Sequence, residues 1–75
     1  MIDVTIHAEV GDRFVAKVAD GGGIGPYGII SLLRRDGSSM RLYTQHGIGW
    51  TRDYLTELRD ELNGALDELE LKEAE

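Results

Sequence analysis

Residues 2–10 alternate apolar and polar side chains without a break, and this alternation constrains the fold more than any other feature. A β-strand points successive side chains to opposite faces, so the pattern predicts a strand with one buried face. Gly11 and Asp12 then predict a two-residue hairpin turn, because glycine accepts the positive φ that such turns need. The apolar face of this predicted strand comprises Ile2, Val4, Ile6, Ala8 and Val10.

Three more strands are predicted after this turn. Residues 13–19 alternate again, and residues 29–35 are apolar on both faces, as in a strand that is covered on both sides. A glycine-rich loop over residues 20–28 connects these two strands. Asp36-Gly37 predicts a second tight turn, and residues 40–45 predict the last strand.

A single helix is predicted to follow the strands. Leucine and alanine recur at helical spacing over about residues 51–70, and Thr51 stands where an N-cap belongs. The last residues, 71–75, are expected to fray. These patterns together predict an α+β fold, in which a four-stranded antiparallel β-sheet over residues 2–45 is followed by one C-terminal α-helix.

The length of 75 residues predicts a single domain, residues 1–75, with a small hydrophobic core. The chain has no Cys, so no disulfide or thiolate metal site supplements that core, and no cofactor or metal centre is predicted. Apolar surface left over on the third strand and the helix favours a homodimer, unless a long loop covers it. The expected dimer or partner interface comprises Leu58, Asp60, Glu61, Leu62, Leu66 and Leu69.

The net charge of −6 is distributed unevenly along the chain. Acidic and basic residues balance over residues 1–50, whereas residues 51–75 carry all the excess negative charge. The acidic residues of the helix form either a solvated face or a polyanionic surface that mimics a phosphate backbone or repels nucleic acid. No apolar run is long enough to span a bilayer and no secretory signal is recognised, so a cytoplasmic protein without membrane association is expected.

Basic and aromatic residues of the predicted sheet favour nucleic-acid binding. Proteins bind single-stranded nucleic acid with a positive groove that follows the phosphates and with aromatic rings on which the bases stack. Strand alternation brings Lys17, Arg41 and Tyr43 to one face of a meander. The alternative is that these side chains simply decorate an exposed sheet. The full candidate set is Lys17, Arg34, Arg35, Arg41 and Tyr43.

No sequence pattern predicts catalysis. Residues 23–28 match the dinucleotide-binding fingerprint G-x-G-x-x-G, but a β-branched run follows where that motif requires a helix. This segment is therefore predicted to be a connection between strands. No serine is placed beside a base, and His46 is predicted to be an exposed loop histidine without a chemical role. The chain is expected not to be an enzyme.

A resemblance to a known family rests on three short stretches. They are residues 28–37, the segment Gly47-Ile48-Gly49-Trp50-Thr51, and the helix start with Tyr54, Leu55 and Leu58. With the predicted element order, they resemble the single-strand-DNA-binding transcriptional coactivator family known as positive cofactor four, over about residues 13–66.

The resemblance implies a homodimer whose helices pack together and whose sheets form a nucleic-acid groove. This sequence departs from the family at two places. Gln45 and His46 stand where the family usually has basic residues, and Gly49-Trp50 replaces its Ser/Thr-Leu pair. The family is also typically basic, whereas this chain is acidic.

The leading interpretation is thus a non-enzymatic, homodimeric module that binds single-stranded nucleic acid or is associated with transcription. A second interpretation is a small acidic protein of a phage or mobile element, which inhibits a host nucleic-acid-handling protein through its helix. A third is a purely structural subunit that only dimerises.

Overall fold

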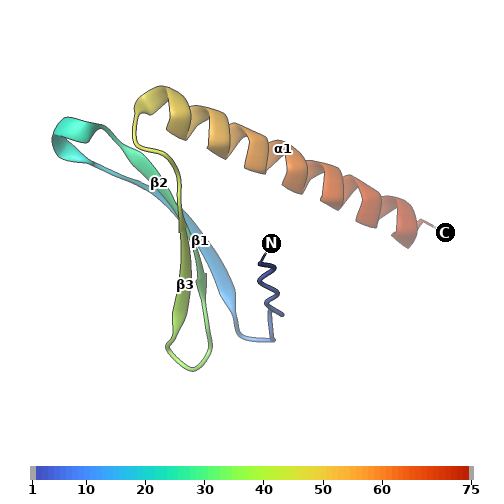
Figure 1. Ribbon diagram of the computed structural model, residues 1–75. Helices are drawn as coiled ribbons and strands as arrows, with labels where there is room; N and C mark the ends of the chain where they lie inside the picture. Colours follow the sequence, from blue (N-terminus) through green and yellow to red (C-terminus); the bar gives the residue numbers. More distant parts are fainter. Residues whose placement is uncertain (1, 75) are drawn as a thin grey trace.

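The computed structural model describes residues 2–74, which form a three-stranded antiparallel sheet followed by one long helix (Figure 1). The strands form a meander with β2 in the centre. In chain order the elements are β1 (Arg13–Ala19), the 3-10 turn η1 (Gly22–Ile24), β2 (Tyr27–Leu33), β3 (Ser39–Tyr43) and α1 (Ile48–Glu73). The expected Asp36-Gly37 turn is confirmed between β2 and β3, where the Arg34 N–H donates to the Ser38 carbonyl at 2.9 Å.

The prediction of four strands is wrong, because residues 2–10 form no strand in the structure. The turn at Gly11, with φ of 98°, is closed by the Asp12 N–H, which donates to the Glu9 carbonyl at 3.0 Å. The Asp12 carboxylate in turn accepts the Glu9 N–H at 2.9 Å. The Asp12 carboxylate therefore accepts the Glu9 N–H, a backbone donor that would otherwise be needed for pairing with β1. Because residues 2–10 pair with no strand, their alternating apolar side chains form no buried face, and Ile2 is 90% exposed.

The helix is longer than predicted at both ends. It begins at Ile48, with Gly47 rather than Thr51 as the N-cap residue, and it continues to Glu73. Thr51 lies inside the first turns, where it is buried and its hydroxyl donates to the Pro26 carbonyl at 3.0 Å. Its role is thus to fasten α1 to the start of β2. The helix includes residues 71–73, and the expected fraying of the last residues stays a prediction, while Glu75 lies outside the described residues.

The register divides the strand side chains between two faces of opposite character. In the row of Phe14, Leu32 and Met40, every member is apolar. We call this side the apolar face, and it comprises Phe14, Ala16, Val18, Ile30, Leu32, Met40 and Leu42. The opposite side carries all the basic residues of the three strands. We call it the basic face, and it comprises Arg13, Val15, Lys17, Tyr27, Ile29, Ser31, Leu33, Ser39, Arg41 and Tyr43.

Only the first turns of α1 pack on the sheet, on its apolar face. The absence of a side chain at Gly28 lets the helix approach, since a Cβ there would lie 3.3 Å from Leu55 Cδ2 and 3.1 Å from Thr44 Cγ2. From Arg59 onward every described helix residue is exposed, and Figure 1 shows α1 leaving the sheet as an arm. The radius of gyration is accordingly 15.1 Å, compared with about 11 Å for a compact chain of this length.

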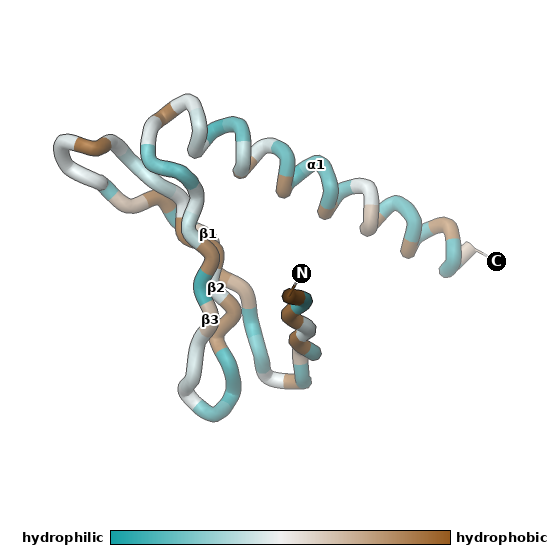
Figure 2. Tube along the Cα trace, in the orientation of Figure 1, coloured by the Kyte–Doolittle hydropathy of each residue, from teal (hydrophilic) through white to brown (hydrophobic). Residues whose placement is uncertain are grey.

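The described part of the single chain, residues 2–74, has no hydrophobic core. Within this part no apolar residue is buried, and the buried polar residues are Ser31 and Thr51. The N-terminal segment runs beside one end of the sheet (Figures 1 and 2). There Ile6 of this segment and Phe14 of the apolar face line a shared hollow. Most of that face nevertheless stays open. Burial of apolar surface is the main favourable contribution to folding, so a single chain of this shape lacks its chief source of stability.

Candidate nucleic-acid interface

The basic face brings together three of the five residues that the sequence singled out for binding. Lys17 and Tyr43 occupy one cross-strand row with Ile29 between them, and Arg41 stands in the neighbouring row. Between these rows lies a shallow groove with a volume of about 220 Å³. Its lining residues are Val15, Lys17, Ile29, Ser31, Leu33, Arg41 and Tyr43.

This face is positively charged although the chain as a whole is acidic. The three strands carry Arg13, Lys17 and Arg41, all on the basic face, and contain no Asp or Glu. The small side chain of Ser31, which is 5% exposed, forms the floor of the groove beside the longer Arg41. Long basic side chains keep their charged heads in solvent while their stems can cover apolar neighbours, and the half-buried Val15 lines the same groove as Lys17 and Arg41. The arrangement favours an anionic ligand.

Three aromatic rings lie in contact at the end of this face that is nearest α1. The ring centroids of Tyr27 and Tyr43 are 5.9 Å apart at an edge-to-face angle of 66°. The His46 ring lies 4.5 Å from that of Tyr27. His46 is an exposed loop residue, as expected, but its ring also contacts Tyr27. Sequence reasoning missed this contact because it depends on the strand register, which brings the start of β2 beside the end of β3.

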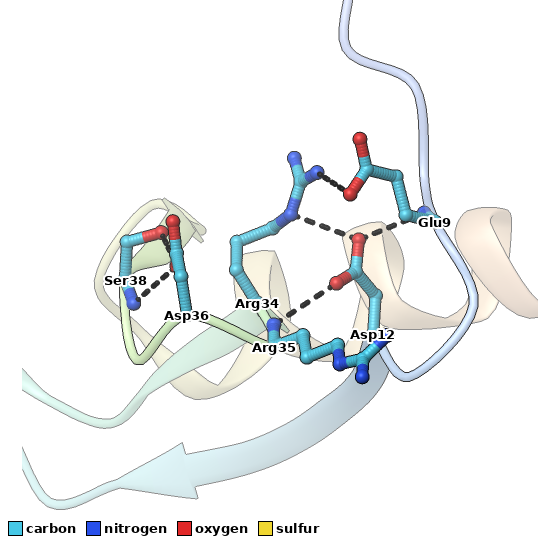
Figure 3. Close-up of polar contacts among 6 residues, drawn as sticks. All are labelled: Glu9, Asp12, Arg34, Arg35, Asp36 and Ser38. Carbon is cyan, nitrogen blue, oxygen red and sulfur yellow. Dashed lines mark hydrogen bonds and ion pairs between the residues drawn. The ribbon is translucent and has the colours of Figure 1, made fainter.

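Arg34 and Arg35, the other two predicted binding residues, lie away from the groove, where β2 turns into β3 (Figure 3). The Arg34 guanidinium pairs with Asp12 at 2.8 Å and with Glu9 at 3.8 Å. The Arg35 N–H donates to the Asp12 carboxylate at 3.1 Å. Asp12 thus holds the N-terminal segment against the β2–β3 turn, and its side chain is only 2% exposed. We call the contacts of Asp12 with Glu9, Arg34 and Arg35 the clasp.

The contacts in this clasp favour the charged form of Asp12. The N–H of Glu9 contributes most, followed by the N–H of Arg35 and the Arg34 guanidinium, and together they lower the pKa of Asp12 below its ordinary value of 3.8 although burial opposes them. Asp36 has a lowered pKa as well, because its carboxylate accepts the hydroxyl and the N–H of Ser38. Both carboxylates therefore stabilise the fold at neutral pH.

Replacing Asp12 with Asn is expected to lower the thermal unfolding midpoint at pH 7 and to weaken its dependence on pH in acid. The folded-state pKa is lowered, so the stabilisation by the carboxylate is complete above the unfolded-state pKa of 3.8 and is lost as the pH falls through the folded-state value. Circular dichroism melts across this range measure both effects. Asp3→Asn on the exposed N-terminal segment is the matched control. Equal midpoints for the two variants at pH 7 would contradict the clasp.

The predicted partner residues are spread along α1. Leu58 is half-buried and, with Glu61, lines a groove between α1 and β3. Asp60 forms an exposed ion pair with Arg59 at 3.1 Å. The leucines beyond them are more than half exposed and form, with Leu55 and Leu58, one stripe along the helix. We call it the leucine stripe, and it comprises Leu55, Leu58, Leu62, Leu66 and Leu69.

Two further findings concern metals and membranes. Residues 2–74 contain no cluster of three or more His, Asp or Glu side chains that could hold a metal ion. Across the same part of the chain, α1 is too polar to cross a bilayer. Comparison of the chain with protein-family models, curated proteins and solved structures yields no match, so the resemblance to the coactivator family stays a prediction.

Proposed function

We propose that the chain is a non-enzymatic homodimer that binds single-stranded nucleic acid on its basic face. The observation that supports binding most directly is the gathering of Arg13, Lys17 and Arg41 on one sheet face without a carboxylate in any strand. A flexible polyanion can lie along such a face and release its condensed counterions. The exposed ring of Tyr43 beside these cations suits the bases of an unpaired strand.

The absence of a core supports the homodimer. Phe14 and Leu42 on the apolar face are 71% and 64% exposed, and Leu66 in the leucine stripe is 56% exposed. The two surfaces meet where α1 leaves the sheet (Figure 1). There Ile30 and Leu42 of the sheet and Leu58 of the helix line one hollow. A contiguous patch of this kind is rare on a monomer. A second copy offers the same two surfaces, as an isologous contact requires.

Charge favours an antiparallel arrangement of the two helices in this dimer. Residues 48–60 of α1 carry two basic and three acidic side chains, whereas residues 61–73 carry one basic and five acidic side chains. Parallel helices would bring the two strongly acidic halves together, but antiparallel helices place each beside the nearly neutral half. The helix is about 39 Å long. Its outer half therefore reaches the apolar face of the partner.

The two proposed surfaces are compatible because they lie on opposite sides of the sheet. The leucine stripe and the apolar face form the dimer contact on the side of α1. The groove with Lys17, Arg41 and Tyr43 opens on the other side. Dimerisation thus leaves Lys17 and Arg41 of each copy free for nucleic acid and doubles the number of sites, while Tyr43 on the edge strand β3 lines both hollows.

Mass-resolved size exclusion, with and without a single-stranded deoxyoligonucleotide, tests the proposal. The free protein is expected to elute with twice the chain mass of 8.3 kDa. At low salt the oligonucleotide is expected to co-elute with the dimer, and added salt should release it steeply. A folded monomer would contradict the homodimer. A dimer that leaves the oligonucleotide unbound at low salt would contradict nucleic-acid binding.

A further inference from the structure

The three aromatic rings extend the basic face beyond its last cation. Lys17 and Tyr43 share a cross-strand row, and Tyr27 stands in the next row, opposite Ala19. His46 follows β3 and contacts Tyr27 from beyond the end of the strand. The basic face therefore offers cations along the groove, and the run of aromatic rings starts at Tyr43 in the groove and continues beyond it through Tyr27 and His46.

Backbone hydrogen bonds hold this aromatic end in place. The Gly47 N–H donates to the Pro26 carbonyl at 2.8 Å, and the Thr44 N–H donates to the Gly28 carbonyl at 2.9 Å. These bonds tie the segment that carries His46 to the start of β2. The loop before η1 adds a wall, since a Cβ at Gly21 would lie 3.2 Å from His46 Cδ2. Rings that are fixed before binding lose little conformational entropy when a ligand stacks on them.

A ligand that uses both ends must combine negative charge with flat, accessible rings. Phosphates of a nucleic-acid strand can contact Lys17 and Arg41, while a neighbouring base stacks on Tyr43. Paired bases in a duplex hide their ring faces from such contacts. We infer that Tyr43, Tyr27 and His46 form a base-stacking subsite, with Tyr43 as the contact surface and the other two rings as its support. This inference rests on the proposed function, and it adds Tyr27 and His46 to the site.

The experiment compares two fluorescent strands of equal length and charge, oligothymidylate and an abasic deoxyribose-phosphate strand. Fluorescence anisotropy is expected to show that the wild-type protein binds oligothymidylate about tenfold more tightly. Tyr43→Leu, Tyr27→Leu and His46→Leu should each reduce this preference and leave binding of the abasic strand unchanged. The slope of affinity against salt should also stay constant, because the cations remain. Trp50→Leu, which removes an exposed ring on α1, is the control.

The outcomes separate the inference from the proposed function. If the wild-type protein binds neither strand, the proposed function fails and the inference fails with it. If both strands bind equally, nucleic-acid binding stands but the stacking subsite is wrong. If the preference exists but survives Tyr27→Leu and His46→Leu, the supporting role of these rings is wrong. Because Tyr43 is 55% exposed, Tyr43→Leu tests the contact surface with little loss of packing within the chain.

Discussion

Leu62→Asp is expected to convert the dimer into a largely unfolded monomer. Leu62 is 56% exposed in the single chain, so the substitution removes little packing within that chain. In the proposed dimer the same side chain is buried, and each copy loses a leucine and gains a buried charge. Loss of a buried leucine alone costs about 2–5 kcal/mol per site. The dimer should therefore dissociate, and the separate chains have no core to keep them folded.

The matched control is Leu71→Asp on the opposite side of the same helix. Leu71 lies nine residues after Leu62, which is about 180° around α1, and it is 70% exposed. Sedimentation and circular dichroism melts at several protein concentrations measure both variants. The Leu71 variant should keep the dimer mass and a concentration-dependent melting temperature. Identical behaviour of the two variants would contradict a dimer contact through the leucine stripe.

The strands that pair locally could be predicted from the sequence. The residues predicted for the second strand, 13–19, are those of β1, and the Asp36-Gly37 turn joins β2 to β3 as expected. A hairpin needs only an alternating pattern on each side of a residue that tolerates positive φ, and Gly37 has φ of 91°. These signals lie close together in the chain. The sequence is therefore sufficient for the meander of three strands.

The predictions that failed depended on contacts between distant residues. The alternation of residues 2–10 satisfied the strand pattern, but the Asp12 carboxylate captures the Glu9 N–H and is itself held by Arg34, 22 positions away. Thr51 had the properties of an N-cap, yet its hydroxyl bonds the carbonyl of Pro26. The helix start is fixed by that tertiary contact. A pattern along the chain does not reveal such partners.

The candidate site was partly predictable, because some of its residues are placed by local strand alternation and others by contacts between distant residues. Alternation alone assigns Lys17, Arg41 and Tyr43 to one face once neighbouring strands pair in a meander, and the register agrees. The position of Arg34 in the acidic clasp and that of His46 beside Tyr27 required the folded loops. The net charge of −6 did not indicate the basic face, because the many acidic residues of α1 outweigh the few basic residues of the sheet.

Reversing the two groove cations with Lys17→Glu and Arg41→Glu should weaken binding of a single-stranded oligonucleotide roughly a hundredfold at about 50 mM salt. Each cation lost removes a charge-assisted contact of about 1.5 kcal/mol or more. The slope of log affinity against log salt should become shallower by about 2, since two phosphate contacts are gone. Fluorescence anisotropy over a salt series measures both quantities.

A second double variant, Arg52→Glu with Arg59→Glu on α1, makes this experiment specific to the basic face. It changes the net charge by the same amount, but both residues are exposed on the helix and outside the groove. A ligand attracted only by overall charge would respond equally to the two variants. A ligand seated on the basic face loses its phosphate contacts only in the first. Equal losses of affinity and equal slopes would therefore argue against the basic face as the binding site.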